Sequence, residues 1–397
     1  MQEAARIRPI AFEETLVDHR TPIAQRSIRI PFLEGPRVLD ADDAITSEVT
    51  RYQVTKYYRD LVATSPYRDQ LKYIVEPSLQ ELSSPGMLDT SGEQDNTVVT
   101  GLQHKYPTTG LLLVTDRCTS YCRYCFRKRI VGKDSDEVTP DYEAVAAYIR
   151  RHPEMTNVLM SGGDPFVLST GKLHAILDHL LPIPHLTSLR FGSKTTAFRP
   201  ARFHDPELRG LFERVHDAGK TPVIVSHFDH VGEITDEAAE AIARVRGYGV
   251  TYLNQSVLLG RVNDDPGTLT ATIARLHAVG TRPYYVFQGR PVKGASHFQV
   301  PIRRGLEIVR ATNERLSGIQ KTFRYIMSHY TGKIEILDLS DDNRLYLRYH
   351  QSPRPGRIGR IFSRPYVEGA SWLDDLPQDR DEPAGAAPVG ALTQPTG

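Results

Sequence analysis

Cysteine is scarce in this sequence, and long apolar runs are missing. Three cysteines in 397 residues exclude a small scaffold held together by disulfides. No apolar run approaches the roughly 18 residues that a membrane-spanning helix needs, and the opening residues MQEAAR lack the apolar stretch of a secretory signal. We therefore expect a cytoplasmic protein whose thiols stay reduced.

An excess of charge of either sign is also absent. The 49 lysines and arginines are balanced by 48 aspartates and glutamates, which leaves a net charge of +1 at pH 7. This balance argues against a nucleic-acid-binding domain and against an acidic tail. We therefore expect neither a nucleic acid nor a membrane as a partner.

Short apolar runs alternate with amphipathic stretches through the middle of the chain. The runs, which we interpret as strands, cover residues 110–115, 157–161, 186–192, 221–227, 251–259 and 282–288. Helices are predicted between them over residues 141–151, 171–181, 206–218, 235–247 and 267–279. This alternation predicts an α/β fold with βαβ units and a parallel sheet. Six such units favour a barrel or partial barrel, whose chemistry gathers at the carboxyl ends of the strands.

Three further segments flank the predicted barrel, which we place at residues 101–300. Residues 1–100 are predicted to be an N-terminal helical extension, with a helix over 46–63. Residues 301–375 form an α+β segment, with a helix over 301–316 and strands over 323–327, 333–339 and 344–349. The tail, residues 376–397, is rich in proline, alanine and glycine and is predicted to be disordered.

All three cysteines lie in one short segment, CTSYCRYC, directly after the first predicted barrel strand: Cys118, Cys122 and Cys125. Three thiolates on one loop can bind one small metal centre, and the spacing suits a [4Fe–4S] cluster with one open iron. A structural zinc site with His104 or another histidine as fourth ligand is an alternative. Scattered buried cysteines and a disulfide are two others. The lack of a fourth cysteine favours the cluster.

Five motifs in chain order resemble the radical S-adenosylmethionine (SAM) superfamily and, more closely, the lysine 2,3-aminomutase family. They are GLLLVTDRCTSYCRYCFRKRIVG (110–132), VLMSGGDP (158–165), VSHFDH (225–230), NQSVLLGRVND (254–264) and RPYYVFQ (282–288). The resemblance covers roughly residues 98–340. It implies a radical SAM partial (βα)6 TIM-like barrel and three cofactors: a [4Fe–4S] cluster, SAM and pyridoxal 5′-phosphate (PLP).

The resemblance also implies a SAM site beside the cysteines. Its residues are Ser161, Gly162, Gly163 and Asp164 for the methionyl amine, and His227 for the adenosine part. Glycines let the backbone approach a ligand, and a carboxylate accepts from an ammonium group. A plain strand-to-helix turn with Asp164 as N-cap is an equally common arrangement, and a lone histidine is more often structural.

A PLP site follows from the resemblance as well. The lysine that forms the Schiff base is Lys333, in SHYTGKIEI, with Lys293 as its rival and an exposed turn lysine as the plain alternative. Three further residues are implied to hold the phosphate and ring: Lys105, Tyr106 and Gln255. Thr109 stands where the family has a second arginine, which leaves the phosphate only partly accounted for.

For the substrate, the resemblance pairs the α-carboxylate with Arg127, since an arginine can donate two parallel hydrogen bonds. The alternative is that residues 127–129 form a solvated basic turn. Members that act on lysine hold its ammonium group with two aspartates, and this chain has Arg290 at one position and about Met327 at the other. Glutamate or a neutral amino acid is therefore favoured over lysine. With no cysteine left over, no structural zinc is expected.

Together these features predict an isomerase, an amino acid 2,3-aminomutase that moves the α-amino group to Cβ. The resemblance implies a small amino acid substrate, an electron donor such as a flavodoxin or ferredoxin, and a homo-oligomer. Two alternatives stay open. One is a radical SAM epimerase or oxidoreductase without PLP, and the other is an iron–sulfur redox-sensing protein.

Overall fold

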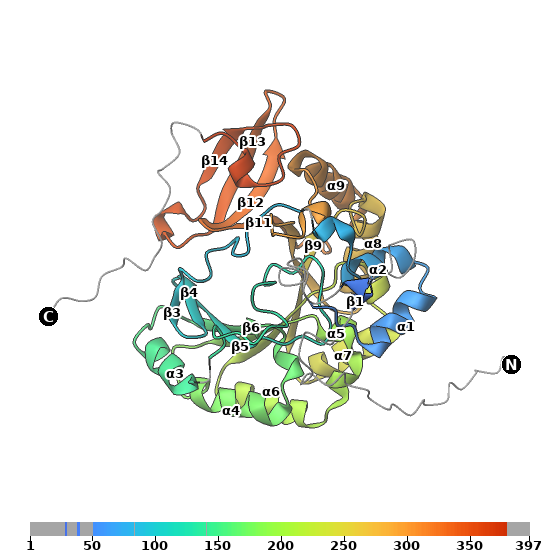
Figure 1. Ribbon diagram of the computed structural model, residues 1–397. Helices are drawn as coiled ribbons and strands as arrows, with labels where there is room; N and C mark the ends of the chain where they lie inside the picture. Colours follow the sequence, from blue (N-terminus) through green and yellow to red (C-terminus); the bar gives the residue numbers. More distant parts are fainter. Residues whose placement is uncertain (1–27, 30–37, 40–50, 83, 140, 379–397) are drawn as a thin grey trace.

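A curved sheet of twelve strands forms the framework of the protein. The computed structural model describes residues 28–29, 38–39, 51–82, 84–139 and 141–378 (Figure 1). Within these residues the sheet runs from β3 to β14 in unbroken chain order. Strands β5 to β11 are parallel, and antiparallel strands extend the sheet at both ends.

The six predicted barrel strands are confirmed, with ends within two residues of the prediction. They are β5 (Thr109–Thr115), β6 (Asn157–Gly162), β7 (Ser188–Ser193), β8 (Thr221–Ser226), β9 (Thr251–Leu258) and β10 (Arg282–Gln288). The predicted helices are confirmed as α3 (Tyr142–Arg150), α4 (Thr170–Leu180), α6 (Glu207–Asp217), α7 (Asp236–Gly247) and α8 (Pro266–Ala278). Side-chain caps from Ser169, Thr235 and Asp265 begin α4, α7 and α8. Short helices in the connections are η3 (Pro165–Val167), α5 (Thr195–Phe198), η4 (Pro200–His204), η5 (Val231–Glu233) and η6 (Ser296–Phe298).

The hydrophobic core lies between the sheet and its helices. Helices α3, α4 and α6 pack side by side along the outer face of the sheet (Figure 1). Successive side chains of a strand point to opposite faces, so in β6 Val158 and Met160 join the core while Leu159 and Ser161 face the inside of the barrel. The outward face of the sheet is thus apolar, and the inward face carries polar groups.

The N-terminal segment differs from the predicted helical extension. The predicted helix over 46–63 starts later: α1 (Lys56–Thr64) is capped by Thr55, and residues 40–50 lie outside the described part. After α1 come α2 (Arg68–Val75), η2 (Leu79–Glu81) and two strands that were not predicted, β3 (Thr97–Val99) and β4 (Leu102–Tyr106). A two-stranded sheet of β1 (Ile28–Arg29) and β2 (Val38–Leu39) was not predicted either.

The C-terminal segment continues the sheet. After α9 (Ile302–Arg315), β11 (Arg324–His329) adds a seventh parallel strand, and β12 (Gly332–Leu339), β13 (Arg344–Gln351) and β14 (Ile361–Pro365) are antiparallel. The predicted helix and three strands are confirmed, and β14 was missed. Short helices η7 (Pro355–Arg357) and η8 (Leu373–Asp375) complete the segment. Beyond residue 378, the predicted tail lies outside the described residues. No described helix is both long enough and apolar enough to span a bilayer.

The loop after β5, which carries the three cysteines, is held by the N-terminal segment. The amides of Tyr121 and Arg123 donate to the carbonyls of Gln53 (2.9 Å) and Ile74 (2.8 Å). The side chain of Gln53 donates to the Cys118 carbonyl at 2.8 Å. The cysteine loop therefore depends on chain that lies outside the barrel.

Three basic residues of this cysteine loop are buried and a fourth, Arg129, is half-buried, and the buried Glu81 and Glu93 pair with all four. Glu81 accepts from Arg123 (2.7 Å) and lies 3.5 Å from the Lys128 ammonium. Glu93 accepts from Arg127 (2.8 Å) and Arg129 (3.1 Å), and the half-buried Arg129 also pairs with Glu137 (2.8 Å). The buried members of this set are Glu81, Glu93, Arg123, Arg127 and Lys128. The interpretation of residues 127–129 as a solvated basic turn is therefore wrong, because an unpaired buried charge would cost several kcal/mol.

We predict that Glu93→Gln destabilises the protein by about 3–5 kcal/mol, because the buried guanidinium of Arg127 loses its carboxylate partner, whereas Arg129 keeps Glu137. Burial alone would raise the pKa of Glu93, but Arg127 and Arg129 outweigh it and the net pKa is lowered. The contribution of a carboxylate with a lowered pKa is complete above the unfolded value of 4.5 and is lost as the pH falls through the folded value. Urea unfolding of both proteins at several pH values measures the difference.

The matched control is Asp134→Asn, which removes an ion pair with Arg117 in which the aspartate is 84% exposed. An exposed pair of this kind contributes at most about 1 kcal/mol. Equal effects of the two substitutions, or an effect of Glu93→Gln that does not shrink toward low pH, would contradict the role assigned to Glu93.

Candidate active site

One cavity of about 340 Å³ lies inside the barrel and receives every site residue that the sequence predicted. Its lining includes Lys105, Tyr106, Cys118, Cys122, Cys125, Arg127, Ser161, Gly162, Gly163, Asp164, His227, Gln255, Arg290 and Lys333. Many of these follow the carboxyl ends of the parallel strands, where barrel folds gather their chemistry. The volume is in the range of small-molecule and cofactor sites.

The three cysteines are free thiols on the cysteine loop, and each lines the cavity. The disulfide alternative is thus not present. His104, the fourth ligand considered for zinc, is not among the residues that line the cavity. Burial raises the pKa of all three thiols when no metal neutralises them. Three thiols, with no fourth cysteine in the sequence, suit a cluster with one open iron.

Gly162 and Gly163 are required by the close approach of the cysteine loop to the end of β6. Gly162 has a φ of +109°, and a Cβ there would lie 2.4 Å from the Thr115 carbonyl oxygen. A Cβ on Gly163 would lie 2.0 Å from the Arg117 carbonyl oxygen. Both positions therefore exclude a side chain. The neighbouring backbone of the cysteine loop is enough to require glycine, without a bound ligand.

Asp164 is the N-cap of η3, as in the plain strand-to-helix turn that the sequence left open as an alternative to a SAM site. Its carboxylate accepts from the amides of Phe166 (3.0 Å), Lys194 (2.8 Å) and Thr195 (2.9 Å), and from the Ser193 hydroxyl (2.9 Å). These bonds join the loop after β6 to the loop after β7. An ammonium group bound at Asp164 would be an additional donor to a carboxylate that already orders two loops.

His227 belongs to a buried network that the sequence did not indicate. Its Nε2 lies 3.1 Å from both the Tyr124 hydroxyl and the Asp229 carboxylate, and its ring stacks on Tyr124. Asp229 also accepts from the Lys194 ammonium at 2.7 Å. Burial alone would raise the pKa of Asp229, but His227 and Lys194 lower it far more. The imidazole is therefore held in one orientation at the edge of the cavity.

Arg127 lines the cavity, but its guanidinium is already engaged. Besides Glu93, it donates to the Ser161 hydroxyl at 2.8 Å and the Gly162 carbonyl at 3.3 Å. A substrate carboxylate at this position would have to share the group with Glu93. No sequence motif indicated Glu93, because it precedes the barrel and becomes adjacent only in the folded protein.

Lys333 follows the tight turn between β11 and β12, and its side chain enters an aromatic part of the cavity. The ammonium nitrogen lies 5.4–5.9 Å from the ring centres of Tyr106, Phe287 and Tyr285. Burial lowers its pKa to about 7, with a further contribution from Arg290. Its rival, Lys293, is not among the lining residues. Lys333 is thus a buried lining lysine whose amine is easily deprotonated.

Lys105, on β4, bonds to the end of β11 and so links the two ends of the parallel part of the sheet. Its ammonium group donates to the carbonyl of Ser91 at 2.9 Å and to that of His329, at the end of β11, at 3.0 Å. Burial and Arg290 lower its pKa to about 7. The next residue, Tyr106, also lines the cavity, and its ring lies beside the Lys333 ammonium group.

Arg190 is a cavity residue that the sequence analysis missed. It lies on β7, its side chain lines the cavity, and its Nε is buried with no hydrogen-bond partner within the described part of the chain. A buried guanidinium with a free donor is costly unless a ligand satisfies it. An arginine at an inward position of the strand SLRFGS was the signal that could have identified it.

The second position expected to face the substrate side chain was about Met327, on β11. Met327 is fully buried in the core, whereas its neighbour Ser328 lines the cavity. Arg290 donates to the Ser328 hydroxyl at 3.0 Å, and its guanidinium lies 4.1 Å from the centre of the Phe126 ring. Arg290 therefore faces the cavity. Its pKa, lowered to about 10 chiefly by burial, still leaves it charged at neutral pH.

Comparison with known proteins adds sequence relatives along most of the chain. The sequence is 42% identical over 331 residues to the Aquifex aeolicus protein named "Putative L-lysine 2,3-aminomutase", covering 83% of this chain and 88% of that one. It is 33% identical over 248 residues to L-lysine 2,3-aminomutase of Escherichia coli, covering 62% and 71%. It is also 33% identical over 272 residues to glutamate 2,3-aminomutase of Clostridioides difficile, covering 68% and 63%.

The search of family models returned no match. Among solved structures, a radical SAM methyltransferase from Sphaerobacter thermophilus matches 57% of this chain and 68% of that one, at 17% identity and a TM-score of 0.38. The sequence relatives decide the classification, since identity above 40% extends over 88% of the Aquifex protein. The chain belongs to the lysine 2,3-aminomutase family of radical SAM enzymes.

Proposed function

We propose that this protein is a PLP-dependent amino acid 2,3-aminomutase that moves the α-amino group of an acidic or neutral L-α-amino acid to Cβ. The observation that supports this most is that three cysteine thiols and the buried, easily deprotonated Lys333 line the same cavity. Lys105 has a similarly lowered pKa, but its amine is held by two backbone carbonyls. The family implies a [4Fe–4S] cluster, SAM and PLP as cofactors. Because the relatives are named as aminomutases, we favour an enzyme over the alternative of an iron–sulfur redox-sensing protein.

The residues of the cavity fit these cofactors. Cys118, Cys122 and Cys125 would bind three irons, and the fourth iron would face SAM. When bound, the reduced cluster and SAM supply the initiating radical, and PLP carries the migrating amine. The side chains around them position the reactants and exclude water.

For PLP, the protein offers an amine and unsatisfied cations. A lysine whose pKa is near 7 is substantially unprotonated at neutral pH and can act as a nucleophile. The phosphate has lost one expected partner at Thr109, but the free Nε of Arg190 offers another. Lys105 and Arg190 are therefore the residues that we assign to the phosphate, and Tyr106 and Gln255 to the ring.

The charge of the cavity supports an anionic substrate. The described lining contains two acidic side chains, Glu93 and Asp164, against six basic ones: Lys105, Arg127, Arg190, Lys194, Arg290 and Lys333. Both carboxylates already accept several hydrogen bonds from the protein. A substrate ammonium tail would find no free counter-charge here, whereas a carboxylate tail would meet Arg290.

Sequence identity alone does not separate the substrates, because the relatives include both lysine and glutamate enzymes at 33% identity. The feature that favours an acidic substrate over lysine is the charge of Arg290, whose hydrogen-bond partner Ser328 is neutral. We assign glutamate, or another amino acid with a carboxylate or neutral side chain, as substrate. A flavodoxin or ferredoxin as electron donor, a homo-oligomeric state and a cytoplasmic location complete the proposal.

Cys122→Ala should abolish reductive cleavage of SAM, because only two of the three thiolates that would bind the cluster remain. Anaerobic incubation with SAM and dithionite, followed by quantification of methionine and 5′-deoxyadenosine, measures this. Circular dichroism confirms that the variant is folded. A Cys122→Ala protein with full cleavage activity would refute the proposed cluster.

Borohydride treatment of the PLP-loaded protein should leave the pyridoxyl group on the peptide that contains Lys333. Lys333→Ala should lose this label and the aminomutase activity while it retains SAM cleavage. Lys293→Ala is the control and should keep both. A label on Lys293 would show that the family motif has been carried over to the wrong lysine.

The unmodified enzyme should prefer glutamate to lysine by at least about a hundredfold in kcat/KM, since each buried charge contact is worth about 1.5–3 kcal/mol. Arg290→Asp should shift the preference toward cationic amino acids. Ser328→Ala, which keeps the charge of Arg290, should shift it far less. Efficient turnover of lysine by the unmodified enzyme would overturn the assignment of Arg290.

A further inference from the structure

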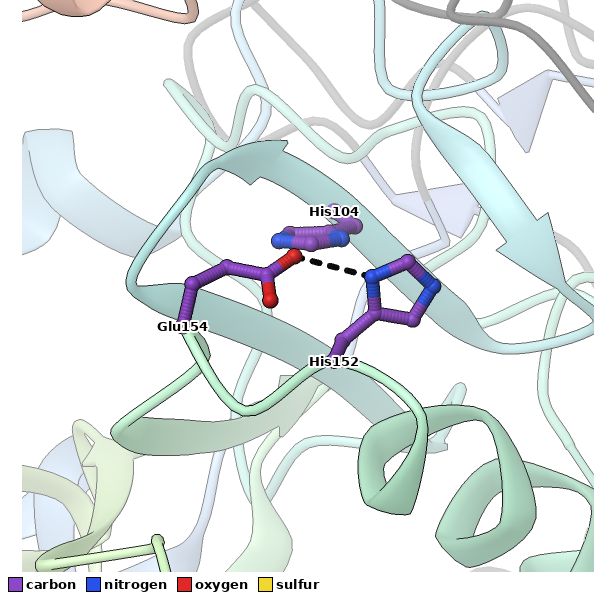
Figure 2. Close-up of side chains that lie close together, drawn as sticks. All are labelled: His104, His152 and Glu154. Carbon is purple, nitrogen blue, oxygen red and sulfur yellow. Dashed lines mark hydrogen bonds and ion pairs between the residues drawn. The ribbon is translucent and has the colours of Figure 1, made fainter. Parts of the chain in front are cut away.

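A second group of ligand-type side chains lies outside the cavity, on the outer face of the barrel. His104 lies on β4, where its neighbours Gln103 and Lys105 line the cavity and His104 does not. Its ring contacts Tyr148 of α3 instead. His152 and Glu154 lie in the turn between α3 and β6, so two separate parts of the chain meet here (Figure 2).

The three side chains converge on one point. Each offers a ligand atom, and these atoms all lie within 4.8 Å of one another. Figure 2 shows the Glu154 carboxylate directed between the two imidazole rings. The Nδ1 of His152 and the Oε1 of Glu154 are 2.9 Å apart. Two ligands of a tetrahedral ion lie roughly 3.3 Å apart, given metal–ligand bonds of about 2.0–2.1 Å. Closing a separation of at most 4.8 Å to this value takes at most about 1.5 Å of movement, in a turn where His152 and Glu154 are partly exposed.

The surroundings hold His104 in the form that binds metals. Its Nε2 lies 3.1 Å from the Pro107 carbonyl, which can only accept, and its Nδ1 lies 3.1 Å from the Tyr148 hydroxyl. A neutral imidazole oriented by a backbone carbonyl is the usual arrangement around a histidine ligand.

We propose that His104, His152 and Glu154 bind one divalent transition-metal ion of the zinc class. Two imidazole nitrogens and one carboxylate oxygen suit Zn²⁺, Ni²⁺ or Cu²⁺ better than Mg²⁺ or Ca²⁺. Three protein ligands leave a fourth position for water. The site contains no cysteine, so it is independent of the three thiols and of the cysteine-based zinc site considered from the sequence.

Such an ion would tie β4 to the turn after α3. β4 is the strand that carries Lys105 and Tyr106 into the cavity. The ion would thus brace one wall of the catalytic cavity from outside. It would take no part in the reaction itself.

The test is an anaerobic calorimetric titration of Zn²⁺ into the cluster-loaded full-length enzyme, in which the cysteines are already occupied. We expect one additional zinc per chain, with an absorption-edge spectrum that shows nitrogen and oxygen ligands and no sulfur. His152→Ala and Glu154→Gln should each weaken binding at least about tenfold. Glu154→Gln conserves the shape of the turn, which separates a lost ligand from a misfolded turn.

His179→Ala is the matched control. His179 pairs with Glu143 at 3.2 Å on the surface beside α3, but no second histidine joins them in that described region. This variant should bind zinc as the unmodified enzyme does. Equal affinity in all four proteins, sulfur in the coordination shell, or no additional zinc would each overturn the proposal.

Discussion

Two buried carboxylates hold the most highly charged part of this protein together. Glu81 and Glu93 pair with four cations of the cysteine loop, three of which are buried. An isolated charge in such a place costs several kcal/mol, so neither partner can be buried alone. The loop after β5 and the segment before β3 must therefore take their places together. The geometry of the thiols thus depends on chain outside the barrel.

One electrostatic property of the cavity has two chemical consequences. Its lining is strongly basic, and the guanidinium of Arg290 is charged and faces it. Such a cavity attracts phosphate and carboxylate groups. The same burial and the same cations make protonation of Lys333 unfavourable and lower its pKa to about 7. A reactive amine and an anion-binding cavity therefore arise together from one arrangement of charges.

Prediction from sequence succeeded where the pattern was local. The barrel strands and helices repeat with a clear period, and their ends were placed within two residues. β3, β4 and β14, at the two ends of the sheet, were missed because such short strands show little apolar alternation and depend on pairing with a neighbour. The helix predicted over 46–63 starts at Lys56, where Thr55 provides the cap. Met327 was mistaken for the cavity residue because a slip of one residue on a strand moves a side chain to the other face.

The sequence by itself determined the barrel strands and helices, the grouping of three thiols on one loop, and the family. These depend on residue type and spacing along the chain. Only the tertiary structure decided which charges meet. Glu93 is 34 residues from Arg127, and Lys105 is 224 residues from His329. The unsatisfied Nε of Arg190 and the convergence of His104 with His152 likewise exist only after the sheet has curved. Contacts between distant segments are set by the packing of the whole barrel, and no local pattern encodes them.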